Sequence, residues 1–469
     1  MAVTAAFLAS LQQAVGADHV HTDAATLEAY GMDALRKGRP ADVVVCPGTT
    51  EEVSAVLRAC TAHRVPVVPR GAGTGYTGGA VPLAGGVVLS LERFTRIIEI
   101  DEANLLAVVE SHVVTGELQA AVARVGLYYP PDPASLGQST IGGNVAECAG
   151  GPRAFKYGVT RRYVLGLEAV LPDGQIIHTG GKTVKNVVGY DLTQLLVGSE
   201  GTLAVITRVI VRLVPLPPAQ VTLRASFASI RDAAVAVSAL IRARVVPAAI
   251  ELIDADTLDA ARAYQPTPPI APEGTGALLL IEVDGLPAAV REEAERVELA
   301  CREAGASVVE VALDVATQQA LWDVRRVMSF AVRALAPLKI NHDIVVPKGR
   351  IPELFDLLDR LKREYGLRIP SFGHAGDGNI HVNIMVDPAD ADLMARARAA
   401  ERALFEGTVA LEGSITGEHG IGFSKLPFIG LEVGEAELAL MRRLKAAFDP
   451  HGLLNPGKVL PGDRRATGQ

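Results

Sequence analysis

PRGAGTGYTGG, at residues 69–79, is the most informative stretch of the sequence for the fold. It contains a G-x-G-x-x-G at Gly73, Gly75 and Gly78, which is the spacing of dinucleotide-binding loops. In those folds a helix begins directly after the loop, and its N-terminus holds the pyrophosphate. Residues 80–86 read AVPLAGG instead and lead into an expected strand, which argues against a nicotinamide-type site. The glycines still present successive backbone N–H groups with no side chain in the way, so the loop is predicted to bind an anionic group.

Two further glycine-rich tracts follow this loop. Residues 130–158 contain PPDPAS, IGGN, AGG and YG within thirty positions, and residues 198–203 read GSEGTL. Several backbone-accessible segments that converge on one ligand suit an extended cofactor, and a flavin is the cofactor that we expect.

Bulk properties exclude several classes of protein. A chain of 469 residues is too long for one ordinary core and predicts two or three domains. The net charge of −8, without a Lys/Arg block, argues against a nucleic-acid binder. Four scattered cysteines without a C-x-x-C cannot hold an iron–sulfur cluster within this chain and fit a reducing cytosol. No run of eighteen apolar residues occurs in the sequence, so no membrane span is predicted.

Patterns along the chain predict a strand-rich first region and a mixed second region. The first has expected helices over 51–64 and 115–125, the latter with Thr115 as N-cap, and a hairpin over 164–178. The proline-rich stretch 215–218 is the predicted boundary. After it, strands and helices alternate, and this alternation favours helices on one face of an antiparallel sheet.

A second cluster of motifs carries chemistry. Residues 373–383 read GHAGDGNIHVN, and residues 416–420 read TGEHG. If 380–385 is a strand, His381 and Asn383 lie on the same face of it. Neutral imidazoles and a carboxylate suit a divalent metal such as Zn or Mn with open positions for substrate. The residues alone leave open that these are unrelated polar loop residues.

The order of these motifs resembles one family over roughly residues 40–460. The chain is similar to FAD-linked oxidases of the vanillyl-alcohol-oxidase/PCMH superfamily, which include D-lactate and D-2-hydroxyglutarate dehydrogenases. It is most similar to the flavin subunits of bacterial glycolate oxidases. The resemblance rests on the loop at 69–79 and on PPDPAS, IGGN, KYG, GYDL, GSEGTL, the GH-x-GDGN-x-H motif, GEHG and LNPGK, together with ECAGG, KNVVGYDLT and KIN.

The resemblance implies an α+β fold. It predicts an N-terminal helical segment (1–37), a PCMH-type FAD-binding domain of two α+β subdomains (38–216), and an α+β FAD-oxidase C-terminal substrate domain with an antiparallel sheet (219–460). The FAD is expected to be noncovalent, because Thr74 stands where some relatives carry a linking histidine. The residues expected to line the FAD are Arg70, Gly71, Ala72, Gly73, Thr74, Gly75, Ser135, Gly143, Asn144, Gly150, Tyr157, Gly158, Gly201, Ile206 and Asn455.

The resemblance also implies an activity, namely oxidation of glycolate, D-lactate or another small 2-hydroxy acid to the 2-oxo acid. Hydride would go to flavin N5 with metal-assisted deprotonation by His419. Arg325 and Lys339 are candidates to hold the substrate carboxylate, and Asn383 to hydrogen-bond substrate. The metal ligands would be His374, His381 and Glu418. His342 stands where relatives are expected to carry an acidic residue, and we expect it at the surface.

Electrons must leave the flavin by an outside route, because this chain encodes no second redox centre. The expected partners are a second flavin-fold subunit and an iron–sulfur subunit. We expect a cytoplasmic protein that such partners could hold at the inner face of a membrane. Three alternatives stay open: a stand-alone D-lactate or D-2-hydroxyglutarate dehydrogenase, a non-catalytic flavin-fold subunit, and a metal hydrolase with an incidental glycine-rich loop.

Overall fold

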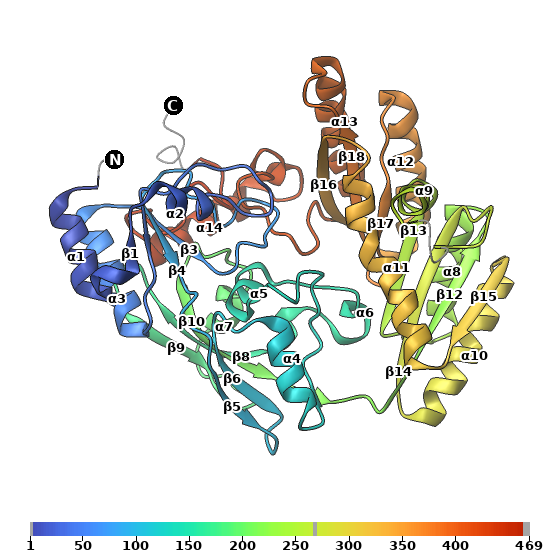
Figure 1. The fold of residues 1–469 in the computed structure, drawn as a ribbon, viewed down its shortest axis with the longest axis horizontal. Coiled ribbons are helices and arrows are strands. Elements are labelled where there is room, and N and C mark those ends of the chain that lie inside the picture. The colour runs from blue at the N-terminus through green and yellow to red at the C-terminus, as the bar shows by residue number, and fades with distance from the viewer. Residues whose placement is uncertain (1–2, 266–269, 463–469) are drawn as a thin grey trace. The chain divides into compact units, whose positions relative to one another are not determined.

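The computed structural model describes residues 3–265 and 270–462. The chain folds into two compact units (Figure 1). The first comprises Met1–Gly150, Val159–Leu216 and Glu418–Gln469, and the second comprises Gly151–Gly158 and Pro217–Gly417. Residues 1–2 and 266–269, which fall within the first and third predicted domain ranges, lie outside the described residues.

The first unit begins with a four-stranded sheet in the order β1-β2-β4-β3, in which β2, β4 and β3 run parallel. Thr49 caps helix α3 (Thr50–His63) by accepting a hydrogen bond from the N–H of Glu52. The apolar face of α3 packs into the core of this unit. The helix predicted over 51–64 is confirmed. The elements are α1 (Ala5–Val15), β1 (Val20–His21), α2 (Ala24–Ala29), β2 (Val43–Val45), α3 (Thr50–His63), β3 (Val67–Arg70) and β4 (Val87–Ser90).

The same unit holds a five-stranded antiparallel sheet in the order β5-β6-β10-β8-β9, which confirms the predicted hairpin as β8 and β9. Thr115 is not the N-cap, because Val114 occupies that position and the Thr115 hydroxyl instead bonds to the carbonyl of Ser139. The elements are β5 (Ile97–Asp101), β6 (Leu106–Glu110), α4 (Thr115–Ala123), β7 (Leu127–Tyr128), α5 (Ile141–Glu147), β8 (Val164–Val170), β9 (Ile176–Gly180), α7 (Leu192–Leu196), β10 (Val205–Arg212), β11 (Val214–Pro215) and α14 (Glu435–Phe448).

The second unit is built on a seven-stranded antiparallel sheet in the order β15-β12-β14-β13-β17-β18-β16. Its elements are α6 (Ala154–Tyr157), β12 (Ala219–Phe227), α8 (Ile230–Arg242), β13 (Ala249–Asp254), α9 (Ala255–Tyr264), β14 (Ala277–Gly285), α10 (Pro287–Glu303), β15 (Val308–Ala312), α11 (Val315–Arg333), β16 (Leu338–Val345), α12 (Ile351–Tyr365), β17 (Ser371–His374), β18 (Asn379–Val386) and α13 (Ala391–Ala410).

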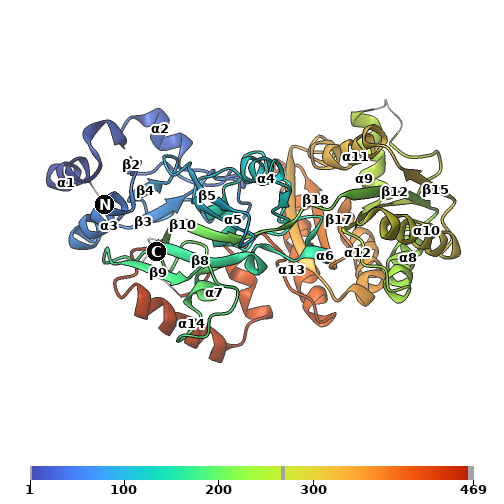
Figure 2. The ribbon, with the colours of Figure 1, turned by 90° about the horizontal axis from the view of Figure 1, so that it is seen from below.

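Helices cover both faces of this sheet, so the expectation of helices on one face was wrong. Figure 2 shows α9 and α11 on one side and α8, α10, α12 and α13 on the other. Helix α11, which the sequence patterns did not predict, begins at the N-cap Asp314 and packs Val324 and Met328 against Phe372 of β17.

Alternation along β18 separates a polar from an apolar face. Asn379, His381 and Asn383 point to the face that α11 and α9 partly cover, and Ile380 and Val382 point to the other. The predicted strand and the shared face of His381 and Asn383 are therefore confirmed.

Cross-strand register brings charged residues of neighbouring strands to the polar face of this sheet. Asp343 of β16 pairs with His381, and Glu251 of β13 pairs with His374 of β17. Lys339 lies four residues before Asp343 on β16 and therefore points to the same face. Four neighbouring strands thus contribute polar side chains to one surface.

His342 points to the opposite face from Asp343 and is buried, so its expected surface position was wrong. Its ring lies edge-on to Phe405 of α13, with centroids 4.9 Å apart, and its Nε2 lies 3.1 Å from the carboxylate of Glu401. Among residues 3–265 and 270–462, no helix is both long and apolar enough to cross a membrane.

Candidate active site

The glycine-rich loop after β3 offers a row of backbone donors. Within the described part of the chain, none of the N–H groups of residues 71–75 donates a hydrogen bond to another group of the protein. A side chain at Gly71 would bring its Cβ within 2.6 Å of Thr140 Oγ1, so only glycine lets the loop lie this close to the start of α5. Unused amides in a loop of glycine and small side chains fit the phosphates of an FAD.

Buried side chains hold the loop from behind. The Asn455 amide donates to the carbonyls of Gly79 (2.9 Å) and Glu200 (2.8 Å), and Lys458 Nζ donates to the carbonyl of Val81 (2.7 Å). Burial lowers the pKa of Lys458 to about 8. Arg70 Nη1 donates to the carbonyl of Met32 (2.7 Å). Arg70 and Asn455, both predicted to line the FAD, thus use their side chains to shape the loop.

The other predicted FAD residues of the first unit lie in turns and at strand ends. Asn144 is buried in α5, where its amide donates to Thr115 Oγ1 (2.7 Å). Gly201 has a φ of +65°, and Ile206 lies beside a β-bulge in β10. Gly143 follows Gly142 in α5, and the carbonyl of Ser135 closes a turn by accepting from the N–H of Gln138 (2.8 Å).

Tyr157 and Gly158 group with the second unit, and the Tyr157 hydroxyl donates to Asp284 (2.6 Å). Lys156 donates to the same carboxylate (2.5 Å), and Arg153 pairs with the buried carboxylate of Glu282 (2.8 Å). These contacts anchor segment 151–158 on β14. The hydroxyl proton of Tyr157 is therefore used within the protein.

The predicted metal ligands come together. The rings of His374 and His381 stand nearly perpendicular, with centroids 5.2 Å apart. One potential ligand atom each from His374, His381 and Glu418 lies within 4.8 Å of the others, and Glu418 directly follows Gly417 of the second unit. Gly378 has a φ of +87°, and a Cβ there would overlap the carbonyl oxygen of Val346. Two imidazoles and a carboxylate fit a borderline divalent ion.

Glu251, which sequence reasoning missed, holds two of the predicted site residues. Its Oε1 lies 2.5 Å from His374 Nδ1, and its Oε2 accepts from Arg325 Nε. Burial would raise the pKa of Glu251, but Arg325 and His374 outweigh burial and hold that pKa below its usual range. The available signal was a glutamate between the apolar residues Ile250 and Leu252 of a strand, because a charge in such a position requires partners.

Arg325 lies on α11 with its guanidinium carbon 4.7 Å from the centre of the Phe372 ring. Its Nε is used by Glu251, whereas its two terminal nitrogens donate to no group within residues 3–265 and 270–462. A planar fork with two open donors can bind a carboxylate bidentately.

Lys339 supplies a second cation on the same face of the sheet. Its Nζ donates to Ser329 Oγ (3.1 Å), one helical turn along α11 from Arg325. Burial, followed by the nearby Arg333, lowers the pKa of Lys339 to about 8. Asn383 is fully buried, and its amide already donates to the carbonyl of Pro370 (3.1 Å) and accepts from Asn341 (2.8 Å).

The predicted base, His419, lies in the first unit. Its ring stacks on Tyr76 of the glycine-rich loop, with centroids 5.3 Å apart, and its carbonyl accepts from Thr77 Oγ1 (3.0 Å). A Cβ at Gly150 would lie 2.9 Å from the carboxylate of Glu418. Residues of two predicted FAD-site motifs thus lie against the Glu418–His419 pair.

Asp343 is a second missed residue. Its fully buried carboxylate accepts from the N–H of Gly417 (2.8 Å), directly before Glu418, and so fixes the backbone there.

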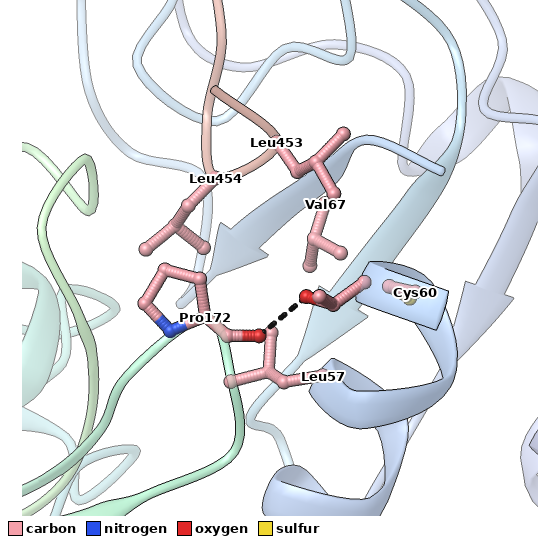
Figure 3. A pocket seen from close by; sticks show the side chains of 7 residues that line it. Leu57, Cys60, Val67, Pro172, Leu453 and Leu454 are labelled. Carbon is pink, nitrogen blue, oxygen red and sulfur yellow. Dashed lines mark hydrogen bonds between the residues drawn. The ribbon is translucent and has the colours of Figure 1, made fainter. Parts of the chain in front are cut away.

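A small pocket in the first unit is apolar and is lined by Leu57, Cys60, Val67, Pro172, Leu453 and Leu454 (Figure 3). In its wall Thr61 Oγ1 already donates to the carbonyl of Pro172 (2.6 Å), so it does not suit a charged substrate.

Comparisons with known proteins show the family to which the chain belongs. Residues 41–180 match the family model "FAD binding domain", and residues 216–459 match "FAD linked oxidases, C-terminal domain". The chain is 44% identical to glycolate oxidase subunit GlcD of Bacillus subtilis (strain 168), covering 90% of each chain. It is 39% identical to D-lactate dehydrogenase of Archaeoglobus fulgidus, covering 89% of this chain and 91% of that one.

Solved structures share the fold at low sequence identity. p-Cresol methylhydroxylase superposes with a TM-score of 0.82 at 18% identity, covering 98% of this chain and 96% of that one. 4-Ethylphenol oxidase from Gulosibacter chungangensis superposes with a TM-score of 0.77 at 21% identity, covering 97% and 96%. These matches confirm the predicted α+β fold with a PCMH-type FAD-binding domain, and the family models leave no ground for the metal-hydrolase alternative. The chain belongs to the FAD-linked oxidases, as an FAD-dependent oxidoreductase of the glycolate oxidase and D-lactate dehydrogenase type.

Proposed function

We propose that this protein oxidises a small 2-hydroxy acid, glycolate or D-lactate, to the corresponding 2-oxo acid. The observation that carries the proposal is the shared carboxylate of Glu251, which joins His374 of the candidate metal group to Arg325. Glu251 thus holds a candidate metal ligand close to a cation that can bind a carboxylate. This arrangement suits a substrate whose hydroxyl and carboxylate are on adjacent carbons.

The roles of the chain's own residues follow from their chemistry. Arg325 would bind the substrate carboxylate with its terminal nitrogens, and Lys339 would add a second positive charge. His374, His381 and Glu418 would hold a divalent ion, and His419 would accept the hydroxyl proton. When bound, FAD supplies the hydride acceptor and the divalent ion supplies positive charge that favours the deprotonated hydroxyl.

The electron acceptor and location are part of the same proposal. Relatives at 44% and 39% identity bear the name glycolate oxidase subunit, which supports work within a multi-subunit complex. We propose a second flavin-fold subunit and an iron–sulfur subunit as partners, with the complex in the cytoplasm or at the inner membrane face. The D-lactate dehydrogenase relatives favour a second candidate, a stand-alone D-lactate dehydrogenase.

An anaerobic visible spectrum tests the proposal. The purified flavin-loaded protein is mixed separately with glycolate, D-lactate, L-lactate and D-2-hydroxyglutarate, and flavin absorbance is followed. Rapid bleaching by glycolate or D-lactate is expected. Bleaching by D-2-hydroxyglutarate alone would contradict the substrate class, and bleaching by none of the acids would contradict the proposed activity of the isolated chain.

A further inference from the structure

Glu251 lies at the centre of the second unit's sheet, on β13 between β14 and β17. Its side chain is fully buried, yet both carboxylate oxygens have partners with a role under the proposal above. One oxygen faces His374 Nδ1, and the other faces Arg325 Nε.

The contact with His374 fixes the tautomer of that imidazole. An ionised carboxylate can only accept hydrogen bonds, so the proton of a neutral His374 must be on Nδ1. The lone pair is then on Nε2, the nitrogen that would ligate a metal. A carboxylate behind a ligating histidine both orients the ring and increases its basicity.

The contact with Arg325 fixes the substrate-binding cation by the same means. With Nε bound to Glu251 and the guanidinium lying against Phe372, the rotation of the fork is restricted. The two terminal nitrogens remain available to a ligand. Because one carboxylate holds both groups, their separation is set by a single rigid side chain.

We propose that Glu251 is a positioning residue that sets the metal-ligating tautomer of His374 and the orientation of Arg325 together. This inference rests on the proposed function. It predicts that one substitution weakens both metal binding and substrate binding, although Glu251 touches neither ligand.

The strand beside β13 provides a matched control. Glu282 of β14 points to the same face, is almost fully buried and pairs with Arg153 (2.8 Å) and with Trp322 Nε1 (2.8 Å). It has no contact with His374 or Arg325 among the contacts of the described residues. Loss of a buried carboxylate is therefore common to both variants, and loss of the histidine contact is specific to Glu251.

The experiment compares Glu251→Gln with Glu282→Gln. A glutamine has one acceptor oxygen for two donors, so its NH2 faces either Arg325 or His374 Nδ1, and the latter favours the Nε2–H tautomer that cannot ligate. The Zn²⁺ affinity of the metal-free, flavin-loaded protein is measured by competition with a chromophoric chelator. We expect Glu251→Gln to weaken it roughly 10–100-fold and to raise the KM for the hydroxy acid, with the Zn²⁺ affinity of Glu282→Gln unchanged.

Outcomes separate this inference from the proposed function. If His381→Ala binds Zn²⁺ as tightly as the wild-type protein does, the metal site itself is overturned. Normal, His381-dependent Zn²⁺ binding that Glu251→Gln leaves intact would overturn only the role of Glu251. If Glu251→Gln does not fold, ¹⁵N chemical shifts of the His374 ring in the metal-free wild-type protein, assigned by comparison with His374→Gln, decide. The Nδ1–H tautomer is expected, and the Nε2–H tautomer overturns the inference.

Discussion

Arg325 and its neighbour Arg326 offer a direct comparison of two adjacent side chains. Arg325 is mostly buried between Glu251 and Phe372. Arg326 is largely exposed and, among the described residues, pairs only with Asp323 on its own helix. Adjacent helix residues face different directions, so the same substitution at each position separates a site effect from a loss of helix charge.

We predict that Arg325→Lys lowers kcat/KM for the hydroxy acid by roughly 10–100-fold, because a bidentate charge-assisted bond contributes about 1.5–3 kcal/mol. Arg326→Lys is the control and should leave kcat/KM unchanged. Steady-state kinetics with an artificial electron acceptor measure both. Equal effects of the two substitutions would remove Arg325 from substrate binding.

The burial of Lys339 predicts a pH dependence. Its pKa is lowered to about 8, so its positive charge is present below pH 8 and is lost as pH rises through that value. We expect the KM for the hydroxy acid to rise above about pH 8. In Lys339→Arg that rise should move to higher pH, because arginine stays charged. An unchanged pH profile of kcat/KM in Lys339→Arg would assign the rise to another group.

The same shift has a consequence for stability. Because the folded-state pKa of Lys339 lies below the ordinary 10.5, the folded protein binds fewer protons than the unfolded chain between about pH 8 and 10.5. The contribution of Lys339 to unfolding free energy therefore becomes more favourable as pH rises through that window. Denaturant titrations of wild type and Lys339→Met on either side of about pH 8 measure this difference.

Among single residues, the sequence identified the His374, His381 and Glu418 group, which lies together as predicted, whereas their metal-binding role stays a prediction. Glu251, Ser329 and Asp343 were missed as parts of the site. Each acts by holding another residue across strands or from strand to helix, and such pairings depend on a register that a local motif does not contain.

Among the elements, the β17–β18 turn determines the spacing of the two histidines. Gly378 occupies the left-handed region, and a Cβ would overlap the carbonyl of Val346. We predict that Gly378→Ala destabilises the protein by about 1–3 kcal/mol and weakens Zn²⁺ binding, because the turn must rearrange. Gly349→Ala, where a Cβ would have open space, is the control and should change neither. Thermal unfolding and chelator competition measure the two effects.

Local patterns predicted strands and helices well where one face is continuously apolar. The alternation in β18 and the amphipathic α3 were recognised for that reason. Helix α11 was not predicted from the sequence, although it buries an apolar face that includes Leu321, Val324 and Met328.

For the whole molecule, chain order and compact units do not coincide. Residues 418–462 return to the first unit, where the N–H of Val67 donates to Leu453 and the N–H of Asn455 donates to Val67. Local sequence carries no signal for such a return, since it rests on contacts between residues far apart in the chain. The family resemblance, by contrast, correctly indicated the FAD-linked class and the PCMH-type fold.

This return predicts that a C-terminal residue controls cofactor retention. Asn455→Asp keeps the shape and the positive φ but replaces an amide donor to the carbonyls of Gly79 and Glu200 with a carboxylate. We expect the FAD dissociation constant to rise by about tenfold or more, because buried acceptors then face each other. Asn104→Asp, an exposed turn residue, is the control. Unchanged FAD retention on gel filtration of Asn455→Asp would contradict this role.

A divalent metal at His374, His381 and Glu418 is the feature on which the proposed oxidation of a 2-hydroxy acid depends most. The decisive measurement is the anaerobic rate of flavin bleaching by glycolate or D-lactate in protein as purified, after chelation, and after return of Zn²⁺ or Mn²⁺. We predict rapid bleaching that chelation abolishes and metal restores, with no bleaching and no restoration in His381→Ala. Equally fast bleaching in fully chelated protein would show that the reaction proceeds without the metal.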